Sequence, residues 1–294
     1  MAALAPAAYH IPLPGALLHE ADDVDIADVD IDALLAARMA AQETVRLPST
    51  VERLVAAVAA RAPLGELTKI LEGDADLAAS IVRLASSPAF TGTLGERISL
   101  PYAVMRLGRE GVRSVCLTAS LARVALVPGP LQGLRRRVWR ECLASALTCH
   151  ALAQVRGLSA DDAYLGGLLH DVGKIAALLA VEADHPHITG PSDEAFWLEV
   201  VERHHCDAGW IMTDRWLLSD AVQAVTARHH LPSGGDPLHE VVQIVDEAVA
   251  RARRQGWQVT ADDIASIYGV RSQDEAMAMR IGLARHPYFL ASIG

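Results

Sequence analysis

Apolar residues recur at the spacing of an amphipathic helix through most of this chain, and prolines and glycines separate one such segment from the next. The segment DADLAASIVRLAS, residues 74–86, places Leu77, Ile81 and Leu84 on one helical face. Of the 294 residues, 51% are hydrophobic, mostly alanine and leucine, and only 4% are aromatic, so residues that favour strands are scarce. The sequence therefore predicts an all-α fold.

The strongest break in this pattern is VPGPLQG, residues 127–133, which holds two prolines and two glycines. We expect two helical lobes, at 47–130 and 134–255, preceded by an N-terminal arm and helix (1–46) and followed by a C-terminal helical tail (256–294). Beyond the break, the pattern predicts helices at about 134–156, 161–183, 193–215, 219–230, 237–255, 260–268 and 271–284. Four tryptophans are expected to fill the core of the second lobe: Trp139, Trp197, Trp210 and Trp216.

The net charge is −10, from 26 basic and 36 acidic residues, which argues against a general nucleic-acid binder. Two local basic clusters remain: Arg135, Arg136, Arg137 and Arg140, and then Arg251, Arg253 and Arg254. We interpret both clusters as solvated helix ends, so direct nucleic-acid binding is not expected.

The four cysteines lie far apart and form no C-x-x-C pair, which favours a reducing compartment over a disulfide framework. The first 19 residues carry no acidic or basic side chain, but Pro6, Pro12 and Pro14 rule them out as a membrane helix, and no other uncharged apolar run reaches about 18 residues. We therefore expect a soluble, cytoplasmic protein that does not bind membranes.

Histidines and aspartates gather in the second half of the chain. The stretch YLGGLLHDVGKIAALL, residues 164–179, sets His170 and Asp171 side by side among apolar residues, where unpaired charges are costly. The further candidates follow in the order His205, His229, His230 and Asp246. Imidazole and carboxylate ligands without thiolates suit Mn, Fe, Zn or Mg, and such a metal could activate water against a phosphate ester. The alternative is a set of hydrogen-bonded core pairs and helix caps that binds no metal.

The motif GLLHDVGKI, residues 167–175, resembles the signature of the HD superfamily of metal-dependent phosphohydrolases. Other stretches resemble its HDOD branch: RHHCDAGWIMTDRWLLSDAVQAVTARHH (203–230) and, within 47–115, LPSTVERLVAAV, EGDADLAASIVRLASSPAF and ISLPYAVMRLGREGVRSV. The resemblance covers residues 47–250 approximately. It implies an all-helical, two-lobed domain that acts as a bacterial signalling or regulatory module, with no hydrolase activity generally assigned.

The resemblance also implies a set of metal ligands: His170 and Asp171, with His205, His229 or His230, and Asp246 as further ones. In the hydrolases, an upstream helix supplies a first histidine about 29 residues before the HD pair. This chain has Glu141 at that distance, and a glutamate can still bind a hard cation. Lys174 follows Asp171 by three residues, so it either forms an ion pair with Asp171 or contacts a phosphate oxygen in an active enzyme.

Two functions from different classes follow. The first, which we favour, is a non-catalytic regulatory module that binds a signalling protein or a small effector in the cleft between the lobes, as a monomer or a homo-oligomer. The second is a metal-dependent phosphohydrolase acting on a nucleotide or another phosphoester. Cleavage of cyclic di-GMP is not expected, because the HD-GYP branch carries Gly-Tyr-Pro where this chain reads HHLPSGGDP. Metal or redox sensing is a third possibility, and its specific support is Cys206 beside His205.

Overall fold

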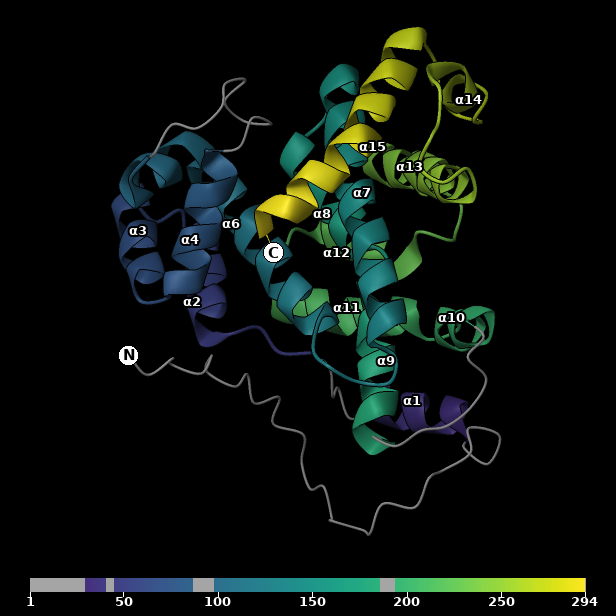
Figure 1. Ribbon diagram of the computed structural model, residues 1–294, viewed down its shortest axis with the longest axis horizontal. Coiled ribbons are helices and arrows are strands. Elements are labelled where there is room, and N and C mark those ends of the chain that lie inside the picture. Colours follow the sequence, from purple (N-terminus) through teal and green to yellow (C-terminus); the bar gives the residue numbers. More distant parts are fainter. Residues whose placement is uncertain (1–29, 41–44, 87–97, 186–193, 294) are drawn as a thin grey trace.

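The computed structural model describes residues 30–40, 45–86, 98–185 and 194–293 (Figure 1). All regular secondary structure in these ranges is helical, which confirms the predicted fold class. The N-terminal arm and the segment 186–193 lie outside the described residues.

The first half of the chain contains five helices: α1 (Ile31–Ala40), α2 (Ser49–Ala59), α3 (Leu64–Glu72), α4 (Ala75–Ala85) and α6 (Leu100–Ala125). The last four pack together, whereas α1 lies apart from them against the second half of the chain (Figure 1). The predicted helix at 74–86 is present as α4, and the Asp74 side chain caps it by accepting a hydrogen bond from the Leu77 amide. Helices α3 and α4 pack against α6, which Gly108 kinks with a φ of 68°.

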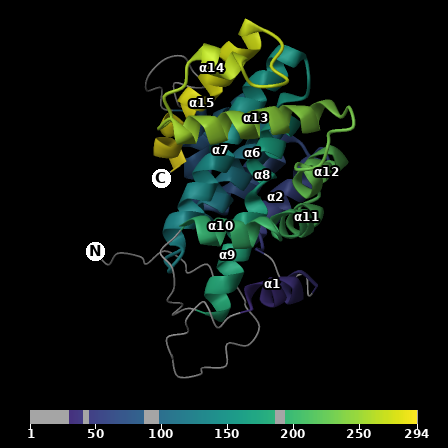
Figure 2. The same cartoon turned by 90° about the vertical axis from the view of Figure 1, so that its right-hand side faces the viewer.

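The second half contains α7 (Gln132–Arg156), α8 (Ala160–Leu169), α9 (Val172–Asp184), α10 (Glu194–Glu202), α11 (His205–Arg215), α12 (Asp220–Arg228) and α13 (Pro237–Arg254). The tail adds α14 (Ala261–Ala265) and α15 (Gln273–Ile293). Helices α13 and α15 both pack along α7 (Figure 2).

Two predicted helices are each split in two by a bend. The helix expected at 161–183 ends at Leu169 and restarts at Val172, and the one expected at 193–215 breaks between α10 and α11. A close crossing of α9 and α11 accompanies the bends: a Cβ on Gly173 would lie 1.9 Å from the His205 carbonyl oxygen. Both bends bring histidines to helix ends, where the site described below is built.

The Pro/Gly stretch 127–133 connects α6 with α7, but a single cluster of buried apolar side chains crosses it. That cluster runs from Val51 on α2 through α6, α7 and α8 to Val222 on α12. The stretch Ala160–Asp184 has the length and apolarity of a membrane span, yet 83% of its most apolar window is buried inside the protein, as in a core helix pair.

Two sequence expectations about burial are wrong. Trp210 is 45% exposed, because α11 turns Ala208, Ile211 and Met212 inward and leaves Trp210 on the opposite face. Arg135 is not at a solvated helix end, because its side chain is fully buried and pairs with Glu182 on α9 at 2.9 Å. The other three tryptophans expected in the core are buried.

Candidate functional site

Helix ends bring the predicted ligands together. His170 is the C-cap of α8 and Asp171 is the N-cap of α9. His205 is the first residue of α11, and His229 is the C-cap of α12 and precedes His230. Asp246 comes from the middle of α13. Four of these helices end or begin at the site, while α13 runs past it and contributes Asp246 from one face.

The Asp171 carboxylate lies at the middle of this centre. Its Oδ1 atom is 3.4 Å from His205 Nε2 and 3.5 Å from His229 Nε2. Its Oδ2 atom is 3.6 Å from His170 Nε2, which in turn lies 3.6 Å from Asp246 Oδ1. The two sides of one carboxylate therefore face two groups of possible ligands.

On the histidine-rich side, three imidazoles converge. His205 Nε2 is 3.2 Å from His229 Nε2 and 3.1 Å from His230 Nε2. Cys206, which the sequence suggested only for sensing, joins them with its Sγ atom 3.5 Å from His205 Nε2. Burial raises the pKa of the Cys206 thiol to about 11, so near neutral pH it is a protonated neighbour of the imidazoles.

Backbone hydrogen bonds fix how two of the imidazoles face the centre. The Nδ1 atom of His170 donates to the Gly167 carbonyl at 2.9 Å, and that of His205 donates to the Glu202 carbonyl at 2.7 Å. A carbonyl oxygen only accepts, so Nδ1 carries the proton and, in the neutral ring, Nε2 keeps its lone pair toward the centre. This orientation is typical of metal-binding histidines.

The spacing of the donor atoms fits a cation. Two ligand atoms bound to one metal at about 2.1 Å, with about 90–110° between the bonds, lie about 3.0–3.4 Å apart. The nitrogen and oxygen atoms here are separated by 3.1 Å to 3.6 Å. Nitrogen and carboxylate donors favour Zn, Fe or Mn.

Positive charge balances the carboxylates of the centre. Lys174 Nζ donates to Asp171 Oδ2 at 2.9 Å and to Glu202 Oε2 at 2.8 Å, so Lys174 forms the ion pair with Asp171 that was one of its two predicted interactions. Burial lowers the pKa of His170, but Asp171 and Asp246 outweigh burial and raise this pKa to about 9. Burial also raises the pKa of Asp171, yet His170 and Lys174 hold it well below its ordinary value.

His205 has the opposite balance. Burial lowers its pKa to about 4 in spite of the Asp171 charge, so its imidazole is neutral near pH 7. A neutral imidazole beside an ionised carboxylate is the state in which both groups bind a metal.

The structure does not bring Glu141 to this centre. Its Oε1 atom pairs with Arg137 Nε at 3.2 Å and with Arg253 Nε at 3.5 Å, in a separate pocket. The next residue, Cys142, is buried, and burial followed by the charge of Asp171 raises the pKa of its thiol well above the ordinary value. The other six predicted metal ligands lie together in the two groups around Asp171.

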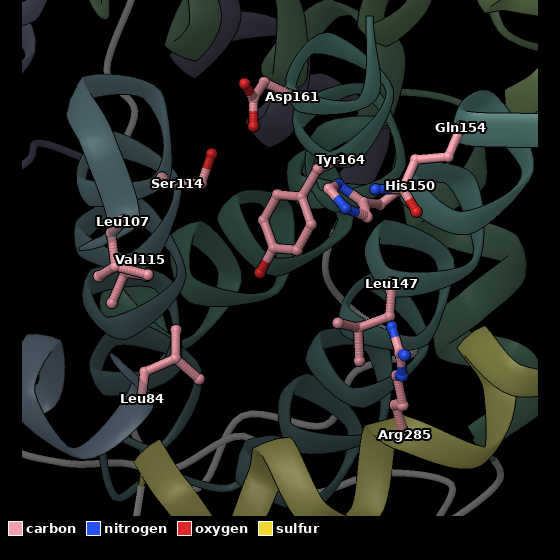
Figure 3. A pocket seen from close by; sticks show the side chains of 11 residues that line it. Leu84, Leu107, Ser114, Val115, Leu147, His150, Gln154, Asp161, Tyr164 and Arg285 are labelled. Carbon is pink, nitrogen blue, oxygen red and sulfur yellow. The ribbon is translucent and has the colours of Figure 1, made fainter. Parts of the chain in front are cut away.

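A second feature is a cavity of about 460 Å³ between the two halves of the molecule (Figure 3). The first half lines it with Leu84, Leu107, Gly111, Ser114 and Val115, and the second half and tail line it with Leu147, His150, Gln154, Asp161, Tyr164 and Arg285. These residues come from five helices. The expected effector site between the lobes is consistent with this position, but none of the lining residues belongs to a motif that singles it out.

Polar groups are placed at intervals along the apolar walls of this interlobe cavity. The Tyr164 hydroxyl on α8 hydrogen-bonds Thr118 Oγ1 on α6 at 2.9 Å, which ties the two halves together. Ser114 is buried and its Oγ atom has no hydrogen-bond partner among the described residues. In Figure 3, Asp161 and Arg285 lie at opposite ends, with Tyr164 between them. The cavity thus offers an apolar body with polar ends, which is typical of a small-molecule site.

Solved structures share this fold. A protein from Shewanella amazonensis SB2B, named "Putative metal-dependent phosphohydrolase", matches with a TM-score of 0.63 and 17% identity over 86% of this chain and 99% of its own. An HDOD domain protein of unknown function from Geobacter sulfurreducens has a TM-score of 0.59 and 22% identity, covering 90% of this chain and 98% of its own. A "Putative signal transduction protein" from Marinobacter aquaeolei VT8 has a TM-score of 0.61 and 20% identity, covering 90% of this chain and 65% of its own.

No curated protein matches the chain. These structural likenesses establish the fold alone, since their identities are low. The model of the HDOD domain matches residues 45–232, which confirms the resemblance seen in the sequence. The chain belongs to the HDOD family.

Proposed function

We propose that this protein is a cytoplasmic regulatory HDOD module that binds a divalent cation at the Asp171 centre and a small effector in the interlobe cavity. One observation carries the proposal: helix α8 belongs to both sites. Asp161 and Tyr164 on α8 line the cavity, and His170 caps the C-terminal end of the same helix. Six residues separate Tyr164 from His170, which is about 9 Å along a helix.

A short, buried helix provides a physical route between the two sites. A ligand that displaces Tyr164 would strain its bond to Thr118 and shift α8 along its axis, moving His170 relative to Asp171. Any such coupling is reciprocal, so a metal at the centre would change the affinity of the cavity for its effector by the same factor. A signalling partner would then recognise the altered relation of the two halves.

The surroundings of Glu141 support regulation over catalysis. With Glu141 held by two arginines, the group around His170 has one imidazole and two carboxylates. Lys174 also places an ammonium on Asp171 itself. The four free cysteines support a reducing, cytoplasmic setting.

Metal affinity in cavity variants tests the proposal. Tyr164→Phe and Thr118→Val each remove the same hydrogen bond from opposite sides, so both should shift the Kd for Mn²⁺ or Zn²⁺ in the same direction. Isothermal titration calorimetry measures the shift, and circular dichroism checks the fold. If both variants bind metal like the unaltered protein, α8 does not couple the sites.

The second candidate is a metal-dependent phosphohydrolase, and the spacing of the nitrogen and oxygen donors favours it. A bound metal would supply Lewis acidity and a water of lowered pKa. His170, Asp171, His205, His229, His230 and Asp246 would hold it, while Lys174 would set a positive charge beside a phosphate oxygen. Turnover of a nucleotide panel with Mn²⁺ that vanishes in Asp171→Asn would favour this candidate. A folded, metal-loaded protein without turnover would exclude it for those substrates.

A further inference from the structure

Two basic clusters that lie more than a hundred residues apart in the sequence meet in one pocket. Arg137 and Arg140 on α7, Arg253 near the end of α13 and Trp257 after it line a cavity of about 360 Å³ together with Glu141. Arg253 is exposed near the end of α13, as the interpretation of both clusters as solvated helix ends expects, whereas Arg140 departs from it because its Nε atom is buried. We call this cavity the arginine pocket.

Positive charge exceeds negative charge in the arginine pocket. Glu141 is its one carboxylate, and it is shared between Arg137 and Arg253. Arg140 has no ion pair or hydrogen bond with any residue that the structure describes, and its Nε atom is buried without a partner. An unpaired guanidinium in a partly buried cavity is costly to desolvate, and an anionic ligand would satisfy it.

An indole forms the remaining wall. Trp257 has a φ of 67°, in the left-handed region that few non-glycine residues adopt. Its ring packs against the His286 imidazole, with centroids 4.3 Å apart and an angle of 32° between the planes, which fixes its position. A fixed, half-buried indole next to guanidinium groups suits a ligand that joins a planar ring to a negatively charged group.

The arginine pocket is separate from the metal centre. Arg253 follows Asp246 by seven residues on α13, which is about 10 Å along the helix. Arg253 and Trp257 also lie beyond residue 232, where the match to the HDOD domain ends. The pocket therefore combines residues inside the matched domain with residues that lie beyond it.

We propose that the arginine pocket binds a small organic phosphate with a planar ring. The phosphate lies against Arg140 with Arg137 and Arg253, whose planar forks match phosphate oxygens, and the ring packs on Trp257. Glu141 acts as an internal competitor, because its carboxylate already uses two of the three guanidinium groups. A phosphate with two negative charges displaces it.

Calorimetry with adenosine 5′-monophosphate, inorganic phosphate and adenosine tests this inference on the full chain, with EDTA present so that no metal contributes. The nucleotide, which carries both features, should bind more tightly than either fragment. Arg140→Gln should weaken nucleotide binding about tenfold. The matched control is Arg254→Gln, which removes the same charge from an exposed arginine that pairs with Glu247 outside the pocket, and it should bind as the unaltered protein does.

Glu141→Gln gives the sharpest outcome because its expected sign is opposite. Removing this negative charge from the pocket should tighten nucleotide binding about threefold. The inference is overturned if none of the three probes binds, if Arg254→Gln weakens binding as much as Arg140→Gln, or if Glu141→Gln weakens it. None of these outcomes depends on metal binding or turnover at Asp171, so the two sites are tested separately.

Discussion

The Arg135–Glu182 pair and the Asp171 centre both bury charge, yet they differ in how that charge is satisfied. Arg135 pairs with Glu182 at 2.9 Å and donates to the carbonyls of Val124 and Val127, while Glu182 accepts the Leu131 amide. At Asp171, by contrast, the nitrogens of three imidazoles and a carboxylate oxygen converge at separations of 3.1 Å to 3.5 Å.

The difference separates a structural ion pair from a ligand-binding centre. The Arg135 guanidinium pairs with the Glu182 carboxylate and donates from its two terminal nitrogens to backbone carbonyls that precede α7, although its Nε atom makes the ion pair without a hydrogen bond. These contacts hold the connection between α6 and α7 against α9. The Asp171 centre instead gathers nitrogen and oxygen atoms at spacings that fit a cation. A ligand should therefore change the stability of one group and leave the other unaffected.

The largest expected effect comes from removing one partner of the Arg135–Glu182 ion pair. Arg135→Met leaves the Glu182 carboxylate buried without its cation, which should lower the free energy of unfolding by about 3–5 kcal/mol. Urea unfolding followed by circular dichroism measures it. The double variant Arg135→Met/Glu182→Leu removes both charges and should recover most of the loss. If Arg135→Met lowers the free energy of unfolding by less than about 1 kcal/mol, the ion pair is not an important source of stability.

The next effect is the stabilisation by a metal bound at the Asp171 centre. At a metal concentration of 100 times Kd, the unaltered protein should gain about 2.7 kcal/mol in its free energy of unfolding. Asp171→Asn should lose this gain, because its carboxylate faces both ligand groups. Arg135→Met, although less stable, should keep it. An equal metal-dependent gain in Asp171→Asn would mean that the metal binds elsewhere.

How much of this the sequence could predict depends on the range of the interactions involved. The helices follow from local apolar periodicity, and the six residues around Asp171 follow from the order of motifs along the chain. The bends at His170 and His204 were missed because apolar spacing continues through them. The bends go together with the close backbone approach of Gly173 to His205, which is a tertiary contact that local spacing does not reveal.

Glu141 shows the limit for the site. A count of residues along the chain places it where a ligand is expected, but neighbouring residues on a helix point about 100° apart. The face of α7 that meets Asp171 is set by packing, and Glu141 instead faces arginines on α7 and α13. The arginine pocket could not be predicted for the same reason, since its two basic clusters meet only in the folded chain.

The third comparison concerns Glu275, a buried carboxylate whose protonation at low pH should weaken its contacts. Glu275 on α15 accepts hydrogen bonds from Arg156 at 3.0 Å and from the Arg271 amide at 2.9 Å. Burial raises the pKa of Glu275, but these partners outweigh it and hold the pKa below its ordinary value. A lowered folded-state pKa adds stability above the unfolded pKa, and this stability is lost as the pH falls toward the folded value. The free energy of unfolding should therefore fall less between about pH 7 and about pH 4 in Glu275→Gln than in the unaltered protein. An identical pH dependence in both proteins would contradict the assignment.

The smallest effect compares two buried serines on α6. Ser120 Oγ donates to the Cys116 carbonyl at 2.8 Å, whereas Ser114 Oγ has no partner among the described residues. Ser120→Ala should destabilise the protein by about 1 kcal/mol, because a made hydrogen bond is lost. Ser114→Ala should leave stability unchanged or raise it by up to about 1 kcal/mol, because a buried hydroxyl without a partner is removed. Parallel urea titrations decide the sign, and equal losses in both variants would mean that Ser114 already has a partner. Two serines on the same helix thus differ in whether their hydroxyl has a hydrogen-bond partner among the described residues, and the one without such a partner, Ser114, lines the interlobe cavity.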